Sequence, residues 1–198
     1  SSRTLAGTHG CKVIGIDLTE AYVRGASAIA RWLGLDHLVE YRHGDALDLP
    51  FEDETFEIAW TQHVAMNIAD KQRMYEEVRR VLKPRGSFAL YDILQGAGGN
   101  LHFPVPWARE PSLSFLVTPD DLRELLVDAG FEVTRWRDTT AAGRNWFRRV
   151  AARNQDGGPP PLGFHLLLGP EFPAMAENMR RNLEENRVAL IEVICQRA

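Results

Sequence analysis

Residues Cys11–Leu18 read CKVIGIDL, a short run of apolar and β-branched side chains that closes on an acid. Such a run is typical of a strand buried on both faces of a parallel sheet. The next segment predicts a helix, because apolar residues recur at helical spacing from Tyr22 to Leu33. Thr19 can cap the start of this helix, and Gly34 can end it. A buried strand followed by an amphipathic helix is the first part of a βαβ unit.

The same alternation continues through the first half of the chain. Strands are expected at Leu38–Arg42, Phe56–Thr61 and Ser87–Leu94, and a helix around residues 74–82 ends at the turn Lys83–Gly86. Strands that alternate with helices indicate an α/β fold. We therefore expect a Rossmann-like, mostly parallel sheet with helices on both faces.

The second half predicts a loop and the remaining elements of one domain. The loop Gln95–Val117 is rich in Gly, Pro and aromatic residues, and loops of that length in a compact domain are usually functional. A capping box opens a helix at Thr118, with Asp121 at the third helical position. The later elements are a strand at Phe131–Trp136, a helix at 140–153, a Gly/Pro linker at Gln155–Pro161, a helix around 172–183 and a closing strand at Val188–Cys195.

These elements predict a single domain over residues 1–198. Residues 1–94 form its cofactor-binding half, and residues 95–198 form its substrate-side half, with a lid-like insertion around 140–185. The apolar, Pro-rich stretch 159–173 could be a lid or a homodimer interface.

Composition excludes several functional classes. The 198 residues carry a net charge of -4, which argues against a broad cationic surface for nucleic acid. No apolar run approaches the ~20 residues of a membrane span, so we expect no membrane partner. Nothing at the start predicts a signal peptide, which favours a cytoplasmic protein. Cys11 and Cys195 lie in apolar runs and are expected to be buried, reduced thiols.

Candidate binding residues follow the strands, because ligands of open α/β sheets bind at the carboxyl ends of the strands. Asp17 ends the first expected strand, where an acid can accept hydrogen bonds from both ribose hydroxyls of a nucleotide. Asp45 follows the second strand, in Gly44-Asp45-Ala46-Leu47, and can accept from an exocyclic amine of adenine. The backbone N–H of Ala46 or Leu47 can serve a ring nitrogen. The alternatives are a helix-capping acid at Asp17 and a solvated loop at Asp45.

Four motifs, in order, resemble those of class I S-adenosylmethionine-dependent methyltransferases. They are Ile16-Asp17, Gly44-Asp45-Ala46, Leu49-Pro50-Phe51 through Phe56, and Val81-Leu82-Lys83-Pro84-Arg85-Gly86. The resemblance covers roughly residues 11 to 94 and implies S-adenosylmethionine as the cofactor. It places Asp17 and the adjacent Leu18 at the ribose, and Asp45 and Ala46 at adenine. Gln62 and His63 would lie beside the methionine portion, with His63 as a candidate proton acceptor.

The second half resembles the small-molecule branch of this family, which includes the sarcosine/dimethylglycine and ubiquinone-biosynthesis methyltransferases. The resemblance rests on Phe103-Pro104-Val105-Pro106-Trp107-Ala108 and Ser114-Phe115-Leu116-Val117. It implies transfer of a methyl group to a small-molecule acceptor, for which an amine is one candidate, without a metal ion. The candidate acceptor-binding residues are Tyr91, Asp92, His102, Trp107 and Phe115.

Two features depart from the family pattern. The Gly-rich loop that would hold the carboxypropyl end of the cofactor is absent, and Arg85 stands where the family commonly has Gly. The strand before that loop would lie between the first and third expected strands. Each buried backbone group that loses its partner costs on the order of 1–3 kcal/mol. We therefore expect residues 1–198 to be part of a longer working protein.

Two other functions remain open at this stage. An NAD(P)-dependent oxidoreductase also uses an acid at this strand end, although the Gly-Asp-Ala element and the lack of a substrate domain argue against it. A non-catalytic module that binds the cofactor or a partner protein is the other alternative.

Overall fold

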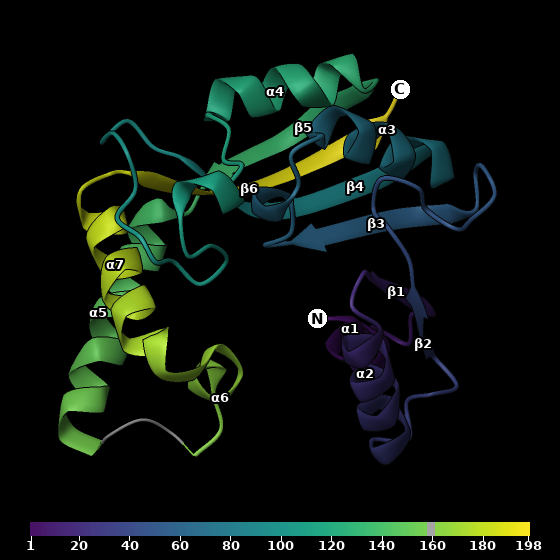
Figure 1. Ribbon diagram of the computed structural model, residues 1–198. Coiled ribbons are helices and arrows are strands. Elements are labelled where there is room, and N and C mark those ends of the chain that lie inside the picture. The colour runs from purple at the N-terminus through teal and green to yellow at the C-terminus, as the bar shows by residue number, and fades with distance from the viewer. Residues whose placement is uncertain (158–160) are drawn as a thin grey trace.

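The computed structural model describes residues 1–157 and 161–198, and the strands there form two separate sheets (Figure 1). In the smaller sheet β1 (Val13–Asp17) pairs in parallel with β2 (Val39–His43). The larger sheet has the order β3-β4-β6-β5, with bounds Phe56–Gln62, Leu82–Gln95, Val188–Arg197 and Phe131–Asp138. β3 is parallel to β4, and β6 is antiparallel to both β4 and β5. The predicted α/β class with a mostly parallel sheet is confirmed.

The helices form three groups around these sheets (Figure 1). α1 (Ser2–His9) and α2 (Glu20–Trp32) pack on the β1–β2 pair, and α3 (Lys71–Val81) and α4 (Pro119–Asp128) lie on one face of the larger sheet. Beyond one end of that sheet lie α5 (Thr140–Gly157), α6 (Phe164–Leu168) and α7 (Phe172–Glu184). Short 3-10 turns are η1 (Ala65–Asn67), η2 (Pro111–Leu113) and η3 (Gly169–Glu171). Among the described residues, no helix is long and apolar enough to cross a membrane.

The main core lies between the larger sheet and the α3–α4 layer. Tyr75 of α3, Phe88 of β4 and Leu122 of α4 are each at most 1% exposed. Burying an apolar side chain of this size contributes about 1.5–3 kcal/mol. A second cluster joins Met179 and Leu183 of α7 to β4, β6 and η1.

Helix ends follow the predicted signals in part. Thr118 and Asp121 form the predicted capping box, and Gly34 has a φ of 67° just after α2. The side chain of Thr19, by contrast, makes no capping bond. Instead, its backbone N–H donates to Asp17 Oδ1 at 2.7 Å, so the acid at the strand end caps the segment that enters α2.

The start of β4 corrects the predicted turn at Lys83–Gly86. β4 begins at Leu82, because Leu82 pairs with Phe56 and an irregularity follows before Ile58. Arg85 lies in this stretch with a φ of 62°, a left-handed conformation that glycine adopts more readily. This conformation explains why the family commonly has Gly where this chain has Arg85.

One burial prediction is wrong. Cys11 precedes β1 and is exposed, whereas Cys195 is buried as a free thiol. The apolar stripe of α2 is also exposed, with Tyr22 at 53% and Leu33 at 59%. The helix forms as the periodicity predicts, but the described elements bury little more of it than Ala30.

The segment after β5 extends further as helix than predicted. α5 continues to Gly157, so the first residues of the predicted linker Gln155–Pro161 are helical, while 158–160 lie outside the described residues. The short helix α6 was not predicted, because its five residues Phe164–Leu168 are too few to show helical periodicity.

The split between the two sheets lies where the motif order predicts a central strand. In the described part of the chain, β1 pairs only with β2, and β3 pairs only with β4. On β3, Ile58 is 65% exposed and Trp60 is 49% exposed. Apolar side chains at these fractions are typical of a strand that would be covered in a complete sheet.

Candidate functional site

The carboxyl ends of four strands bring the candidate residues to one edge of the molecule. Asp17 at the end of β1 pairs in register with His43 of β2, and Gln62 at the end of β3 pairs with Tyr91 of β4. A hydrogen bond of 2.7 Å from Ser1 Oγ to Gln62 Oε1 crosses between the two sheets. This edge is where the ligands of parallel sheets bind.

The position of Asp17 is compatible with both roles considered for it, the capping of a helix and the binding of a ribose. Its Oδ1 accepts from the backbone of Thr19, as a capping acid does, and the residue is nevertheless exposed. A carboxylate offers about four acceptor positions, so this one bond leaves capacity for ligand hydroxyls. Leu18 is 66% exposed beside it, and its carbonyl oxygen lies 2.9 Å from His43 Nε2.

Asp45 lies in the turn that follows β2, as Asp17 lies at the end of β1. Its Oδ1 accepts from the backbone N–H of Leu47 at 2.9 Å, which closes a turn around Ala46. Gly44 N–H donates to the carbonyl of Asp17 at 3.2 Å, so the two acids stand on directly bonded segments. The predicted pair of acids is therefore brought together.

A buried ion pair on α3 holds the loop that follows Asp45. The side chain of Glu77 is 2% exposed and accepts from the backbone N–H of Leu49 at 2.8 Å. Arg80 pairs with Glu77 at 2.7 Å and donates to the carbonyls of Leu49 and Phe51 at 2.9 and 2.7 Å. The hydrogen bond from Arg80 holds the pKa of Glu77 below its ordinary value.

Sequence reasoning missed this anchor. One signal was available, because Glu77 lies within a turn of Met74 and Val81 on the apolar side of α3. An acid on the core face of a helix requires a partner, since burying an unpaired charge is costly.

His63 directly follows β3 and packs against Tyr91. Its φ is 54°, its backbone N–H donates to the Tyr91 carbonyl at 2.8 Å, and the two ring centroids are 4.7 Å apart. Desolvation by these neighbours lowers the pKa of the imidazole. A lowered pKa favours the neutral ring near pH 7, which is the form that can accept a proton.

Asp92 is buried, contrary to the expectation that it contacts an acceptor. The residue is 2% exposed, and its two carboxylate oxygens accept from Val64 N–H at 3.0 Å and Ala65 N–H at 3.4 Å. Desolvation raises its pKa to about 6. Asp92 thus holds the turn that carries His63.

Lys71 fixes the other end of η1. It is 4% exposed, and its Nζ donates to the carbonyls of Ile68 and Phe115, at 2.6 Å for Ile68. Burial lowers its pKa to about 8, and the charge of Asp92 acts in the opposite direction. Lys71 therefore joins η1 to the long loop of the substrate-side half.

The loop after β4 packs over η1. Phe115 is 37% exposed and donates its backbone N–H to the Met66 carbonyl at 3.0 Å, and Trp107 Nε1 donates to Ser114 Oγ at 3.0 Å. His102 turns to α7 instead, with its Nε2 2.8 Å from Glu185 Oε2. Its predicted contact with the acceptor therefore stays a prediction, and its ring is already bound.

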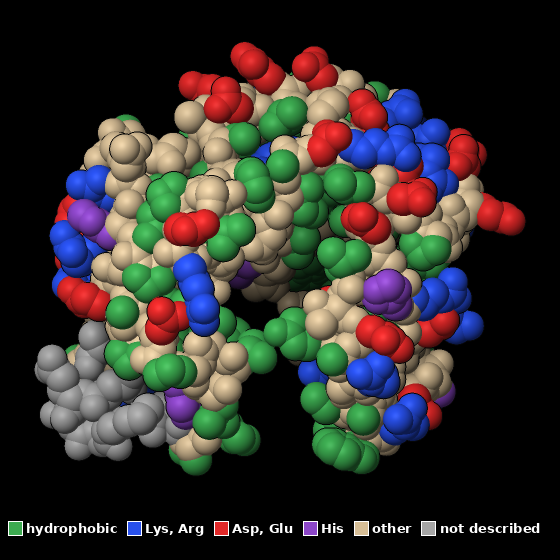
Figure 2. Space-filling model, in the orientation of Figure 1, with side chains coloured by type: hydrophobic (Ala, Val, Ile, Leu, Met, Phe, Trp, Pro, Cys, Tyr) green, Lys and Arg blue, Asp and Glu red, His purple; other side chains and the backbone are tan. Residues whose placement is uncertain are grey.

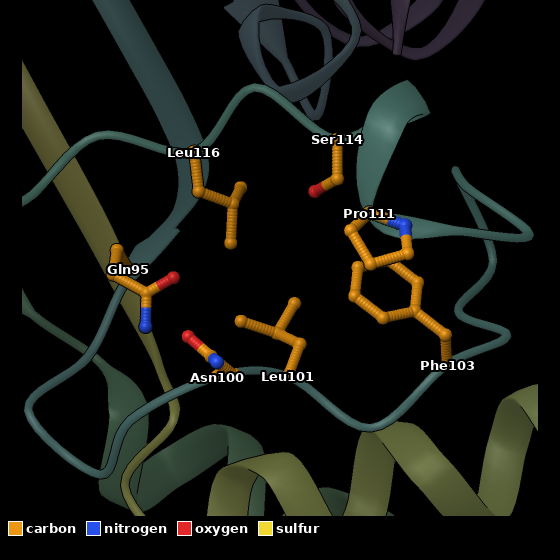
Figure 3. A pocket seen from close by; sticks show the side chains of 7 residues that line it. All are labelled: Gln95, Asn100, Leu101, Phe103, Pro111, Ser114 and Leu116. Carbon is orange, nitrogen blue, oxygen red and sulfur yellow. The ribbon is translucent and has the colours of Figure 1, made fainter.

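An open pocket of about 260 Å³ lies under this loop (Figure 3). The candidates Tyr91, His102, Trp107 and Phe115 do not line it, although the chain neighbours of His102 and Phe115 do. Its lining residues are Gln95, Asn100, Leu101, Phe103, Pro111, Ser114 and Leu116. Figure 2 shows that the molecule is hollowed between its two lower lobes, with hydrophobic side chains along the hollow.

The described residues fit the adenosine part of a cofactor. Two exposed carboxylates at adjacent strand ends match the hydroxyl and amine donors of ribose and adenine. In residues 1–157 and 161–198 no glycine-rich loop lies at the split between β1 and β3 to hold an amino-acid end. Fold and site together define a Rossmann-like α/β domain suited to a nucleoside-bearing cofactor.

Comparison with known proteins finds similarity to methyltransferases. Residues 1–90 match the family described as a methyltransferase domain. The glycine/sarcosine/dimethylglycine N-methyltransferase of Actinopolyspora halophila is 33% identical over 138 residues, which cover 70% of this chain and 24% of that protein. The sarcosine/dimethylglycine N-methyltransferase of Halorhodospira halochloris is 31% identical over 140 residues, 71% of this chain and 50% of that protein. The chain thus spans half or less of the length of these two relatives, and both the family match and the two relatives are methyltransferases.

Solved structures confirm the fold. A putative sarcosine dimethylglycine methyltransferase from Galdieria sulphuraria superposes with a TM-score of 0.80 at 18% identity, over 99% of this chain and 73% of that one. The cyclase SpnF superposes with a TM-score of 0.73 at 24% identity, over 98% of this chain and 68% of that one. Because a protein described as a cyclase has the same fold, the fold alone does not define the reaction.

Proposed function

We propose that this chain carries the cofactor half and part of the acceptor site of an enzyme that transfers a methyl group from S-adenosylmethionine to a small molecule. The observation that carries the proposal is the pair of exposed carboxylates, Asp17 and Asp45, on bonded strand ends of a methyltransferase-family domain. When bound, S-adenosylmethionine supplies a methyl group activated by a sulfonium centre.

The residues of this chain bind and orient the reactants. Asp17 and Leu18 hold the ribose, and Asp45 and Ala46 hold adenine. Methyl transfer is an in-line displacement, for which alignment and exclusion of water are the main contributions of a protein. Near the transferred group, Gln62 contributes a polar side chain, and the neutral imidazole of His63 accepts a proton when the acceptor must lose one.

Methyl transfer is favoured over the two alternatives. The oxidoreductase is disfavoured because the family match and both named relatives are methyltransferases. A function without methyl transfer is kept as the second candidate, because the cyclase SpnF shares the fold.

Two measurements on the full-length protein test the proposal. Calorimetric titration compares S-adenosylhomocysteine with NAD, and we expect binding of the former only. Incubation with S-adenosylmethionine and a set of small amines and alcohols should release S-adenosylhomocysteine, detected by mass spectrometry. Binding without release for any acceptor would support the second candidate, and binding of NAD alone would contradict the proposal.

A further inference from the structure

The pocket in Figure 3 lies beside the end of β4 and is enclosed mostly by the loop that follows this strand. Gln95, on one wall, is the last residue of β4. Ser114 and Leu116, on another wall, flank Phe115, whose backbone is bonded to Met66 of η1. The pocket therefore lies on the same edge as His63, on the side of the substrate-side loop.

Gln95 presents a hydrogen-bond acceptor to this pocket. Its Nε2 lies 3.1 Å from Gly96 O, 2.9 Å from Gly99 O and 3.2 Å from Arg187 O. Three carbonyl oxygens around one end of an amide require the NH₂ group there, because only that group donates. The carbonyl oxygen Oε1 consequently points into the pocket, as Figure 3 shows.

Ser114 presents a donor. Its Oγ accepts from Trp107 Nε1 at 3.0 Å, and within residues 1–157 and 161–198 its hydroxyl proton has no acceptor, so it can donate to a ligand. Figure 3 shows this oxygen turned toward the interior of the pocket. One acceptor and one donor on facing walls match a hydroxyl group, which donates one hydrogen bond and accepts others.

The rest of the lining is apolar or amide, and it carries no charge. Leu101, Phe103, Pro111 and Leu116 supply apolar surface, and Asn100 supplies the remaining polar side chain. None of the seven lining residues is Lys, Arg or His. A carboxylate placed here would lose water without gaining a cation, and it would face Gln95 Oε1. Burying an unpaired charge is far more costly than burying a bonded hydroxyl.

We infer that this pocket binds the methyl acceptor and selects a neutral, largely apolar molecule with a hydroxyl group, which Gln95 Oε1 and Ser114 Oγ recognise. The inference rests on the proposed function. It separates this chain from the two relatives named for glycine, sarcosine and dimethylglycine, whose carboxylates this lining does not accommodate.

A matched pair of probes tests the selection on the full-length protein. Cyclohexylmethanol and cyclohexanecarboxylate share a carbon skeleton and differ in charge. Saturation-transfer NMR and chemical-shift titration, with saturating S-adenosylhomocysteine present, should show at least about tenfold tighter binding of the alcohol, which corresponds to about 1.4 kcal/mol. Equal or tighter binding of the carboxylate, or no binding of either probe, would overturn the inference.

Two pairs of variants locate the binding. Leu101→Trp fills the pocket and should abolish alcohol binding, whereas Leu113→Trp changes a residue that is 50% exposed outside the lining and should not. Ser114→Ala should weaken binding of the alcohol about three- to tenfold. The Oγ of Ser112 donates to Glu110, and Ser112→Ala should leave binding of the alcohol unchanged. Alcohol binding that survives both lining variants would refute this location.

Titration of S-adenosylhomocysteine into each variant separates the two proposals. Retained cofactor binding shows that Leu101→Trp is folded and that its loss of alcohol binding belongs to the pocket. Absence of cofactor binding in the unmodified protein counts against the proposed function, whereas a carboxylate preference with intact cofactor binding counts only against the pocket assignment.

Discussion

Asp92 and Lys71 are buried charges that hold the turn after β3 from its two ends. Asp92 accepts from the backbone at Val64 and Ala65, and Lys71 donates to the carbonyls of Ile68 and Phe115. Burial raises the pKa of Asp92 and lowers the pKa of Lys71, so it disfavours the charged form of each side chain. The position of His63 therefore depends on groups that do not reach the ligand.

The Asp92→Asn variant tests the burial of this carboxylate. The native pKa of about 6 exceeds the ~4 of an unfolded Asp. The native state then binds more protons between these pH values, so its free energy of unfolding falls as pH rises through that window. The variant has no carboxylate at position 92 and therefore lacks this pH dependence. Its free energy of unfolding relative to the unmodified protein should rise by up to about 3 kcal/mol from pH 4 to pH 7. Urea unfolding at several pH values measures this difference.

Asp128→Asn is the matched control, because Asp128 is exposed at the end of α4. Its stability difference from the unmodified protein, measured over the same window, gives the baseline for replacing an exposed Asp by Asn. A difference for Asp92→Asn that does not rise above this baseline with pH would show that the Asp92 carboxylate is not desolvated.

His63 should titrate below the ordinary value of a histidine. Desolvation by its neighbours disfavours the imidazolium form, so the ring is neutral over a wider pH range. NMR of the imidazole protons during a pH titration measures this, and His63→Asn assigns the signal, since Asn tolerates a positive φ. A signal lost in His63→Asn that titrates at about 6.5 or above would contradict the prediction.

Residue positions were predictable from sequence only where a strand end defines them. Asp17 and Asp45 follow apolar strands, and parallel strand ends meet at one edge, so their proximity follows from the pattern. The burial of Asp92 depends on a loop that folds back over β4, and no local pattern records that. The same holds for His102, whose partner Glu185 is distant in sequence.

At the scale of elements, α3 supports both the core and the site. One side of the helix packs Met74 and Val78 into the sheet, while Glu77 and Arg80 hold the loop after Asp45. The loop therefore depends on helix α3 for its conformation, and so does the proposed adenine site.

Glu77→Ala should lower the free energy of unfolding by about 1–3 kcal/mol, because the Leu49 N–H loses its acceptor, whereas Arg80 keeps its bond to Asp53. Cofactor affinity should fall as well, since the loop loses its anchor. Glu76→Ala is the neighbouring control, exposed and bonded only to Gln72 among the described residues, with an expected change within about 0.5 kcal/mol. Equal effects of the two substitutions on urea unfolding would refute the anchoring role.

Elements with strong periodicity were predicted well, and those decided by distant contacts were not. α3, α4 and β6 follow from apolar spacing and caps. The start of β4 was misplaced because Lys-Pro-Arg-Gly has the composition of a turn, whereas pairing of Leu82 with Phe56 extends the strand through it. The helix α2 was predicted correctly, but what covers its apolar stripe is not a property of its own sequence.

At the scale of the whole molecule, the two sheets present the carboxyl ends of their parallel strands at one edge, where the candidate residues lie. The two acids lie at the ends of β1 and β2, Gln62 and His63 lie at the end of β3, and the proposed acceptor pocket is lined by Gln95 of β4 and by the loop that follows it. The contact from Ser1 to Gln62 bridges the split. A ligand that spans the split would be held by both sheets, which is the geometry expected of a cofactor bound between ribose and acceptor sites.

The measurement that tests this account most directly is calorimetric titration of S-adenosylhomocysteine into the full-length protein and into three variants. We expect micromolar binding that weakens at least tenfold in Asp17→Ala and in Asp45→Ala, about 1.4 kcal/mol each. Asp48→Ala removes an exposed acid from the same loop and should bind as the unmodified protein does. No binding by a folded protein, or equal binding by all three variants, would contradict the assignment of Asp17 and Asp45 to the cofactor.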